Sequence, residues 1–405
     1  MGKLKILAAV AAAACPILAG SSTDAGDFLR SAAVFSAGAF PDTSAAPTAD
    51  GAIPDTAEAA YSAETDEAAL TLPPDEWQET ESEFDFPDET AQTAPPASSA
   101  AFPEESLSPA ESGLPQAGRV ISRNITELDE DLSCYNTHSG EILREHYGPS
   151  QGTDHLTLSS GAQVRNCTEL PADELLKAAE ELPAFRVSLG TDEPQVLIIH
   201  THTTEDYEPT ARSFYDAQFP PRTRDSTQNV VAVGEALAQE LAARGVSVLH
   251  DATLHDYPAY TGAYDRSEAT IRAALEEYPG IKVVIDLHRD AMERGDGTRL
   301  APVTDIGGKN AAQFMIIAGC DNGLFNMPDY MENFKFACLI QNTAQELFPE
   351  LARPVLFDYR NYNQHLTTGS LLIEVGSHAN SLDEAKYTGT LLGEILAAAL
   401  VQLEQ

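Results

Sequence analysis

Apolar and polar residues alternate in two distinct ways along the chain from residue 195 onward. Short apolar runs bounded by polar residues predict buried strands, and apolar residues that recur every three or four positions predict helices packed on a sheet. Strands are expected at Val196–Ile199, Val246–Leu249, Val283–Leu287, Phe314–Ala318 and Leu371–Val375, and helices at Asn229–Arg244, Arg266–Glu277, Tyr330–Leu347 and Asp383–Leu403.

This alternation predicts the fold class of residues 192–405. Strands that alternate with helices form an α/β fold with a doubly wound, mostly parallel sheet and helices on both faces. Sheets of this kind bind ligands at the carboxyl ends of their strands. We therefore look for functional residues where the apolar runs end.

Residues 118–191 have a weaker pattern, with short extended pieces such as RVISRN and LTLSSG. One helix is expected at Ala172–Glu181, after a start signal at Pro171. We expect this segment to form a small, β-rich module that is separate from the α/β domain.

Residues 21–117 have a different composition, dominated by Ala, Pro, Ser, Thr and acidic residues, with Arg30 as the one basic residue. Such a segment buries too little apolar surface to offset its chain entropy, so we expect a disordered acidic linker. The whole chain has a formal net charge of −39. Binding to nucleic acid is excluded because phosphate contact needs a basic face.

Residues 1–20 carry the features of an export signal. Lys3 and Lys5 precede an apolar stretch from Ile6 to Gly20, which is the order found in signal peptides. The segment is expected to be cleaved, to remain as a membrane anchor, or to be lipidated at Cys15. Each alternative places the rest of the chain outside the cytoplasm, secreted or anchored at the cell wall or in an intermembrane space.

The cysteines show no CxxC pairing, which argues against a cysteine-rich zinc site. Cys134 and Cys167 lie in one small segment and form a disulfide in an oxidising compartment, or they stay free. Both alternatives remain open at this point.

Three strand ends carry groups that bind metals. The first strand is followed by His200-Thr201-His202, and the third carries Asp286 and His288, two residues apart and therefore on one face. Glu374 ends the last apolar strand, where a carboxylate is costly without a cation or hydrogen-bond donors. Together these residues predict a zinc site with two histidines and one carboxylate.

Four motifs together resemble the stage II sporulation protein P family: HTHTTEDYEP at residues 200–209, D-x-x-x-N-V-V-x-V-G from Asp225 to Gly234, DLHRDA from Asp286, and IEVGSHAN from Ile373. The resemblance covers the chain from about residue 119 to its end. It implies a peptidoglycan hydrolase of sporulation and engulfment, associated with stage II sporulation proteins D and M. It also implies a phosphorylase/hydrolase-like α/β domain similar to zinc N-acetylmuramoyl-L-alanine amidases.

The resemblance to these amidases also implies roles for individual residues. His202 and His288 match the two zinc histidines, and Asp225 matches the carboxylate ligand, with Glu205 as the competing candidate. Glu374 matches the catalytic residue that takes a proton from water and passes it to the leaving amine. Endopeptidase activity on the stem-peptide cross-link is implied by the family alone.

Two further residues are expected to assist the reaction. Arg289 or His200 is expected to steady the oxyanion, because both lie close in sequence to the ligands. The alternatives to an amidase are a zinc peptidase or deacetylase on the same fold, and a non-catalytic scaffold of a cell-wall complex.

Overall fold

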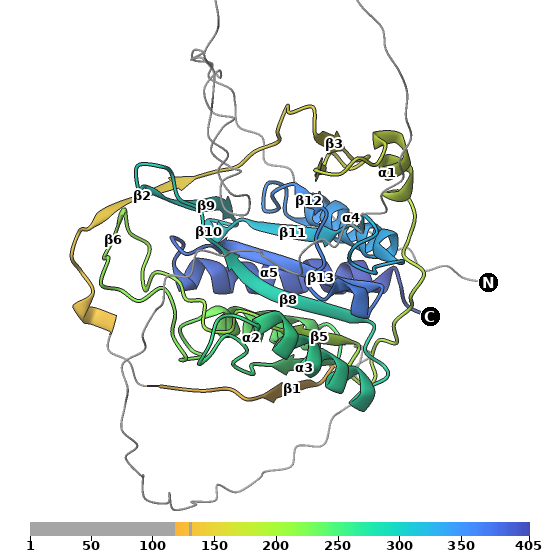
Figure 1. Cartoon of the computed structure of the whole chain (residues 1–405), viewed down its shortest axis with the longest axis horizontal. Coiled ribbons are helices and arrows are strands. Elements are labelled where there is room, and N and C mark those ends of the chain that lie inside the picture. The colour runs from red at the N-terminus through yellow and green to blue at the C-terminus, as the bar shows by residue number, and fades with distance from the viewer. Residues whose placement is uncertain (1–117, 129–131) are drawn as a thin grey trace, which may run out of the picture. The chain divides into compact units, whose positions relative to one another are not determined.

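A computed structural model describes residues 118–128 and 132–405. The expected signal segment and acidic linker lie outside the described residues. Two sheets and five α-helices make up the described part (Figure 1). The helices are α1 (Ala172–Ala178), α2 (Val230–Ala243), α3 (Ala263–Glu277), α4 (Tyr330–Leu347) and α5 (Leu382–Val401), with short 3₁₀ turns η1 (Leu132–Cys134) and η2 (Gln364–Leu366).

The larger sheet has nine strands, and its neighbouring pairs run parallel except β11 with β13 and β3 with β4. A mixed α/β fold built on a large, mostly parallel sheet is therefore confirmed. In order across the sheet the strands are β1 (Val120–Arg123), β7 (Val248–Asp251), β5 (Val196–Ile199), β8 (Val283–Asp290), β13 (Gly369–Ser377), β11 (Phe314–Gly319), β12 (Val355–Asp358), β4 (Gln163–Asn166) and β3 (His155–Thr157).

Helices cover this sheet on both faces, because alternate residues of each central strand enter different apolar cores. Val196 and Ile198 of β5 join the large core that contains residues of α2, α4 and α5. Leu197 and Ile199 join a smaller core with Ile271 of α3. The alternation follows from the two-residue period of a strand, and it explains why β5 is apolar at every position.

Residues 118–191 do not form the separate module that the sequence predicted. The described residues, 118–128 and 132–405, fall in one compact unit, with β1 paired to β7 at one edge of the large sheet and β4 paired to β12 near the other. The physical reason is that this segment has no core of its own: Leu158, Val164 and Leu175 pack into the large core.

The smaller sheet has the order β10-β9-β2-β6. Its strands are β10 (Lys309–Ala312), β9 (Arg299–Ile306), β2 (Gly140–Glu145) and β6 (Phe214–Tyr215). It lies beyond the carboxyl end of β8, from which the chain passes directly into β9 (Figure 1). The apolar pattern of the sequence did not predict this sheet, because its strands are short or only partly buried.

Most boundaries agree with the predicted elements to within a few residues. Strand β5 and helix α4 have the expected bounds, whereas β8 continues three residues beyond the expected end and therefore includes His288 and Asp290. Asn229 caps the start of helix α2: its side chain accepts a hydrogen bond from the backbone N–H of Val231 at 2.9 Å. Such a cap satisfies an amide that the helix leaves unpaired.

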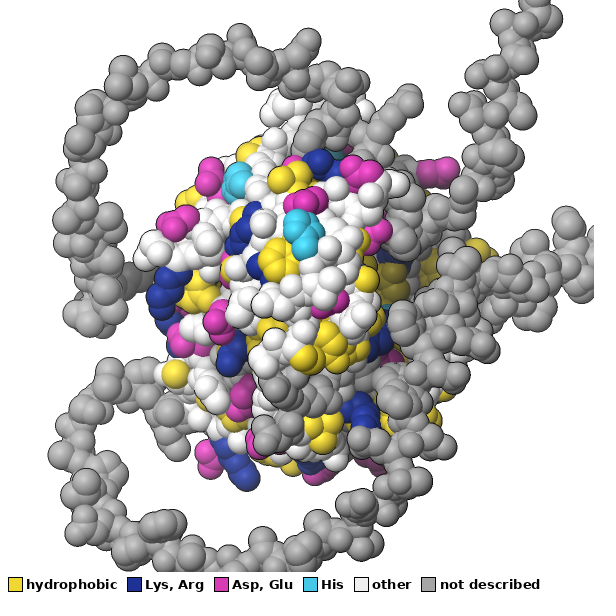
Figure 2. Space-filling view, turned by 90° about the vertical axis from the view of Figure 1, so that its left-hand side faces the viewer, with side chains coloured by type: hydrophobic (Ala, Val, Ile, Leu, Met, Phe, Trp, Pro, Cys, Tyr) yellow, Lys and Arg dark blue, Asp and Glu magenta, His cyan; other side chains and the backbone are white. Residues whose placement is uncertain are grey.

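Three other findings bear on the sequence predictions. Cys134 and Cys167 are both exposed and form no disulfide with each other, so the disulfide alternative is not realised in this structure. Among the described helices, none has the length and apolar character needed to cross a membrane. On the face drawn in Figure 2, acidic side chains are interspersed with Lys and Arg, unlike the basic face that phosphate binding needs.

Candidate metal centre

The central strands of the large sheet bring the candidate residues together. Strands β5, β8 and β13 are neighbours in the order of the sheet, and all three run parallel. His202 follows the end of β5, His288 lies near the end of β8, and Glu374 is paired with His288 in the register of β13 and β8. Parallel strands deliver their carboxyl ends to one edge, as the sequence predicted.

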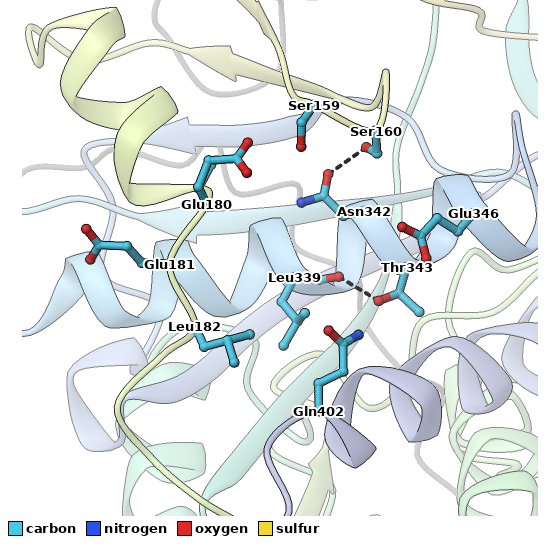
Figure 3. Close-up of a pocket in the computed structure, with 11 residues that line it drawn as sticks. Ser159, Ser160, Glu180, Glu181, Leu182, Leu339, Asn342, Thr343, Glu346 and Gln402 are labelled. Atoms are coloured by element: carbon cyan, nitrogen blue, oxygen red, sulfur yellow. Dashed lines mark hydrogen bonds between the residues drawn. The ribbon is translucent and has the colours of Figure 1, made fainter. Parts of the chain in front are cut away.

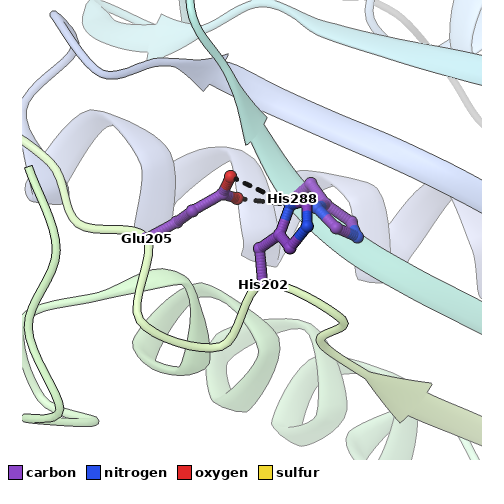
Figure 4. Close-up of side chains that lie close together, drawn as sticks. All are labelled: His202, Glu205 and His288. Atoms are coloured by element: carbon purple, nitrogen blue, oxygen red, sulfur yellow. Dashed lines mark ion pairs between the residues drawn. The ribbon is translucent and has the colours of Figure 1, made fainter. Parts of the chain in front are cut away.

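His202, Glu205 and His288 form one compact group, in which the ligand atoms lie within 4.8 Å of one another (Figure 4). The two carboxylate oxygens of Glu205 face different rings. Oε1 lies 3.5 Å from Nδ1 of His202, and Oε2 lies 3.5 Å from Nδ1 of His288. The carboxylate therefore stands between two imidazole nitrogens.

The loop after β5 holds Glu205 in this place. Glu205 is 5% exposed, and its Oε2 accepts a hydrogen bond from the backbone N–H of Arg289 at 3.2 Å. The guanidinium of Arg222 lies 3.8 Å from Oε1. Burial alone would raise the pKa of Glu205, but the contacts with His202 and His288 and the charge of Arg289 hold it well below its usual value.

His288 is flanked by two carboxylates. Its Nε2 lies 2.9 Å from Oδ1 of Asp286, opposite the nitrogen that faces Glu205. Burial would lower the pKa of His288, yet the charges of Asp286 and Glu205 outweigh burial and raise it well above the usual value. A positive charge is therefore strongly favoured at this place.

This donor set fits a zinc ion. Two imidazole nitrogens and one carboxylate oxygen are the three ligands typical of catalytic zinc sites, which keep a fourth position open. The electrostatics agree, because the buried carboxylates stabilise positive charge between them. Only His202 is partly exposed, with 13% of its side chain accessible, so the site opens on the side of this ring.

Glu374 lies beside this group on β13 and is partly buried. Its Oε2 is buried and has no hydrogen-bond partner among the described residues. Burial and the nearby charge of Asp290 raise the pKa of Glu374 to about 8, although the charge of His288 acts in the opposite direction. A carboxyl group with such a pKa exchanges a proton near neutral pH.

A β-bulge after Glu374 shapes this end of β13. Glu374 pairs with His288 and Ser377 pairs with Asp290, so β13 carries one extra residue between these pairs. Gly376 has a φ of +63°, a left-handed conformation that favours glycine. The side chain of Asn380 closes the turn by accepting a hydrogen bond from the N–H of Ser377 at 2.9 Å.

Two tyrosines fix the ring of His202. Tyr260 stacks on this ring with centroids 4.6 Å apart, and Tyr264 meets it edge-on at 5.6 Å. The guanidinium of Arg222 lies over Tyr260, 4.7 Å from the centre of its ring. Tyr260 is 38% exposed, so an aromatic surface borders the open side of the candidate metal centre.

Asp225, the carboxylate expected to bind the metal, is not a member of the compact group. Its Oδ1 accepts hydrogen bonds from the N–H and the hydroxyl of Thr227, at 2.9 and 2.8 Å. These bonds commit Asp225 to the turn before α2. Glu205, the competing candidate, is the carboxylate that belongs to the compact group.

His200 and Arg289, expected near the oxyanion, are engaged inside the protein. Nδ1 of the fully buried His200 donates a hydrogen bond to the carbonyl of Leu287 at 2.9 Å, and its Nε2 lies 3.0 Å from Nε2 of His250. The guanidinium of Arg289 donates to the carbonyls of Asp206 and Pro221, at 2.8 and 2.9 Å. Arg289 therefore holds the loops of Asp206 and Pro221, whereas His200 contacts strands β8 and β7.

The sequence pointed to Asp286 together with His288 at a strand end but gave Asp286 no separate role, and it gave none to Arg222. The spacing of Asp286 and His288 placed them on one face of a strand, and that signal was available in the sequence. Arg222 and Tyr260 lie in loops of irregular sequence, and only the fold brings them to His202.

A separate pocket of about 330 Å³ lies among the segment after α1, helix α4 and the end of α5 (Figure 3). Glu180, Glu181 and Glu346 line it, and no histidine does. Clusters of carboxylates are common on protein surfaces without a bound ion, and we assign this pocket no function.

Comparisons with known proteins agree with the motifs. The chain is 28% identical to the stage II sporulation protein P of Bacillus subtilis (strain 168) over 219 residues and spans about half of that relative's length, 51%. A solved structure of the N-acetylmuramoyl-L-alanine amidase AmiC2 of Nostoc punctiforme is similar at 11% identity over 51% of this chain and 95% of that one, with a TM-score of 0.29.

The structure of the CwlD amidase from Clostridioides difficile in complex with the GerS lipoprotein is similar at 13% identity, over 51% of this chain and 94% of that one, with a TM-score of 0.31. The family described as Stage II sporulation protein P matches residues 55–397, which is most of the chain. This chain belongs to the stage II sporulation protein P family.

Proposed function

We propose that this protein is a zinc-dependent peptidoglycan hydrolase that acts outside the cytoplasm during sporulation. The reaction we assign is cleavage of the amide bond between N-acetylmuramic acid and L-alanine. The observation that carries the proposal is the compact group of His202, Glu205 and His288 beside Glu374. Membership of the stage II sporulation protein P family supports the same activity.

His202, Glu205 and His288 would hold the zinc. Zinc with three protein ligands supplies Lewis-acid activation of a water molecule and of the scissile carbonyl. Glu374 takes the proton of that water and delivers it to the amine that leaves as the carbon–nitrogen bond breaks. In the metal-free structure the pKa of Glu374 is raised to about 8, and the positive charge of a bound zinc ion would lower it, so that the ionised carboxylate is available to accept the proton.

The open side of the site also supports an extended substrate. The exposed ring of Tyr260 and the guanidinium of Arg222 lie next to His202. Aromatic and cationic side chains of this kind suit a substrate that carries both apolar and anionic groups. Association with stage II sporulation proteins D and M, and endopeptidase activity on the cross-link, stay predictions of the family resemblance.

A digest of purified peptidoglycan with metal-loaded protein tests the proposal. Wild type is expected to bind one zinc ion and to release stem peptides that begin with L-alanine. Glu374→Gln should keep the zinc and lose at least ~100-fold in rate, the usual contribution of a general base. The exposed Glu346, replaced by Gln, is the matched control and should leave the rate unchanged.

The products separate the alternatives. Release of acetate would indicate a deacetylase, and cleavage within the stem peptide would indicate an endopeptidase. If zinc-loaded wild type released no product, the catalytic proposal would be wrong and a scaffold role would replace it. An unchanged rate in Glu374→Gln would overturn the assignment of Glu374 alone.

A further inference from the structure

The two ring nitrogens of His288 face two different carboxylates. Nδ1 lies 3.5 Å from Glu205, inside the compact group shown in Figure 4. Nε2 lies 2.9 Å from Oδ1 of Asp286, which is outside that group; the two atoms are close enough for an ion pair, but they are not aligned as a hydrogen bond in the metal-free structure. Since a neutral imidazole carries one proton, the carboxylate that attracts the proton decides which nitrogen is left to bind a metal.

Asp286 is held in place by hydrogen bonds from Thr201. It is 3% exposed, and its Oδ1 accepts a hydrogen bond from the N–H of Thr201 at 2.8 Å. Its Oδ2 accepts one from the hydroxyl of Thr201 at 2.7 Å. Thr201 directly precedes His202 in the chain, so its hydrogen bonds also link Asp286 to the segment that carries His202.

The support extends to two further elements. The hydroxyl oxygen of Thr201 lies 2.7 Å from Oγ of Ser267 on α3, and Asn363 donates a hydrogen bond to Oγ of Ser267 at 3.0 Å. Ser267 is fully buried and Asn363 is 8% exposed. Asp286 therefore sits in a polar network that joins the end of β5, helix α3 and the turn before η2.

We propose that Asp286 is a positioning residue for the metal centre: it keeps the ring proton of His288 on Nε2 and so presents Nδ1 to zinc. Carboxylates that accept the second N–H of a ligating histidine fix its tautomer and orientation. The network around Thr201 fixes Asp286 in turn. This inference rests on the proposed function, because it concerns the same zinc ion.

The alternative is that Asp286 only stabilises the fold through Thr201. The two roles differ in what the loss of the negative charge does. Asp286→Asn keeps the shape of the side chain and an oxygen that accepts from Thr201, but it attracts the Nε2 proton less strongly. A purely structural role would leave the affinity for zinc unchanged as long as the variant is folded.

Competition with a chromophoric chelator measures the zinc dissociation constant of the full chain. Asp286→Asn should raise it by about 10- to 100-fold, the usual effect of removing a partner of a ligating histidine. Asp251→Asn is the matched control, because Asp251 is 4% exposed and ends the neighbouring strand β7. It should change the dissociation constant less than about 3-fold, within the scatter of such contributions.

Nuclear magnetic resonance of the ring nitrogens of His288 in zinc-loaded wild type tests the tautomer without any substitution. The proton is expected on Nε2, and a proton on Nδ1 would overturn the inference. Thr201→Val offers a second variant if Asp286→Asn does not fold, and it should weaken zinc binding in the same direction.

The outcomes also separate this inference from the proposed function. If wild type binds zinc and hydrolyses peptidoglycan while Asp286→Asn binds zinc as tightly, the role of Asp286 is wrong and the proposed function stands. If wild type binds no zinc, both are wrong.

Discussion

Glu374 has the environment of a carboxyl group that stays protonated near neutral pH. One of its oxygens is buried without a hydrogen-bond partner among the residues described, and burial together with Asp290 raises its pKa to about 8. In the unfolded chain a glutamate titrates near ~4.3. At a pH between these two pKa values, Glu374 is protonated in the folded, metal-free protein and ionised in the unfolded chain.

This difference predicts how the stability of metal-free protein depends on pH. Because the pKa of Glu374 is higher in the folded than in the unfolded protein, protonation of Glu374 stabilises the fold. This contribution is fully present below pH ~4.3 and is lost as the pH rises through about 8. Glu374→Gln resembles the protonated form at every pH. Wild type should therefore lose stability relative to Glu374→Gln by at most ~1.4 kcal/mol per pH unit across this window.

Urea denaturation of both proteins with a chelator present, at several pH values between 4 and 9, measures this difference. Taking the difference between the two proteins removes the contributions of groups that titrate in both of them. A difference in the free energy of unfolding that did not change with pH would show that Glu374 titrates as an ordinary glutamate.

The end of β13 shows how one element positions Glu374, the proposed catalytic group. The bulge after Glu374 requires Gly376, since a Cβ atom there would lie 2.7 Å from Oδ1 of Asn380 and 2.8 Å from Cβ of Ala312. Its φ of +63° adds a second constraint. Bulges near active sites re-aim side chains, and this one ends the regular pairing of β13 directly after Glu374.

Gly376→Ala should therefore destabilise the protein through both backbone strain and contact. A left-handed residue that is not glycine costs roughly 1–2 kcal/mol, and overpacking adds roughly 1–3 kcal/mol. Gly308→Ala is the matched control, because Gly308 has a φ of +81° but no atom within 4 Å of the added Cβ.

The free energy of unfolding in urea should fall by roughly 2–5 kcal/mol for Gly376→Ala and by roughly 1–2 kcal/mol for Gly308→Ala. The rate on peptidoglycan should fall in Gly376→Ala only. Equal losses of stability in the two variants would mean that the turn at Gly376 adjusts to the added methyl group without overpacking.

Elements with a strong apolar pattern could be predicted from the sequence. Strand β5 and helix α4 bury long apolar stretches and were found with their exact bounds. Strands β1 and β4 carry little apolar pattern, and β1 pairs with β7, more than a hundred residues away along the chain. Pairings of this kind depend on the whole sheet, so the expected module at residues 118–191 was wrong.

The candidate site could be predicted only in part, for a related reason. His202, His288 and Glu374 lie at or next to the ends of apolar strands, and the edge of a parallel sheet brings such positions together. Glu205 and Asp225 both lie in loops, where spacing along the chain does not determine which carboxylate reaches the histidines. In the described structure Glu205 is the carboxylate that meets both histidines, because the turn after β5 brings its two oxygens to 3.5 Å from His202 and from His288.

At the scale of the whole molecule, charge and metal binding act on stability together. A net charge of −39 destabilises the compact state through self-repulsion, and any added cation screens it. Zinc binding at the proposed site would add a separate contribution, about 4 kcal/mol when free zinc exceeds the dissociation constant 1,000-fold. Charge screening depends on the total salt concentration, whereas zinc binding depends on the concentration of free zinc relative to the dissociation constant.

Removing zinc with a chelator should therefore lower the melting temperature of wild type at constant ionic strength. One equivalent of zinc should restore most of that loss, whereas screening of the net charge by sodium chloride should rise gradually without a stoichiometric end point. Differential scanning calorimetry measures both titrations.

Two variants assign the stoichiometric effect to the carboxylate ligand. Glu205→Ala removes a carboxylate that faces both histidines, and its melting temperature should no longer respond to one equivalent of zinc. Asp225→Ala, which loses bonds to Thr227, should melt lower than wild type but respond to zinc as wild type does. The reverse result would mean that Asp225 moves to the metal on binding, since its Oδ2 is buried and has no partner among the residues described.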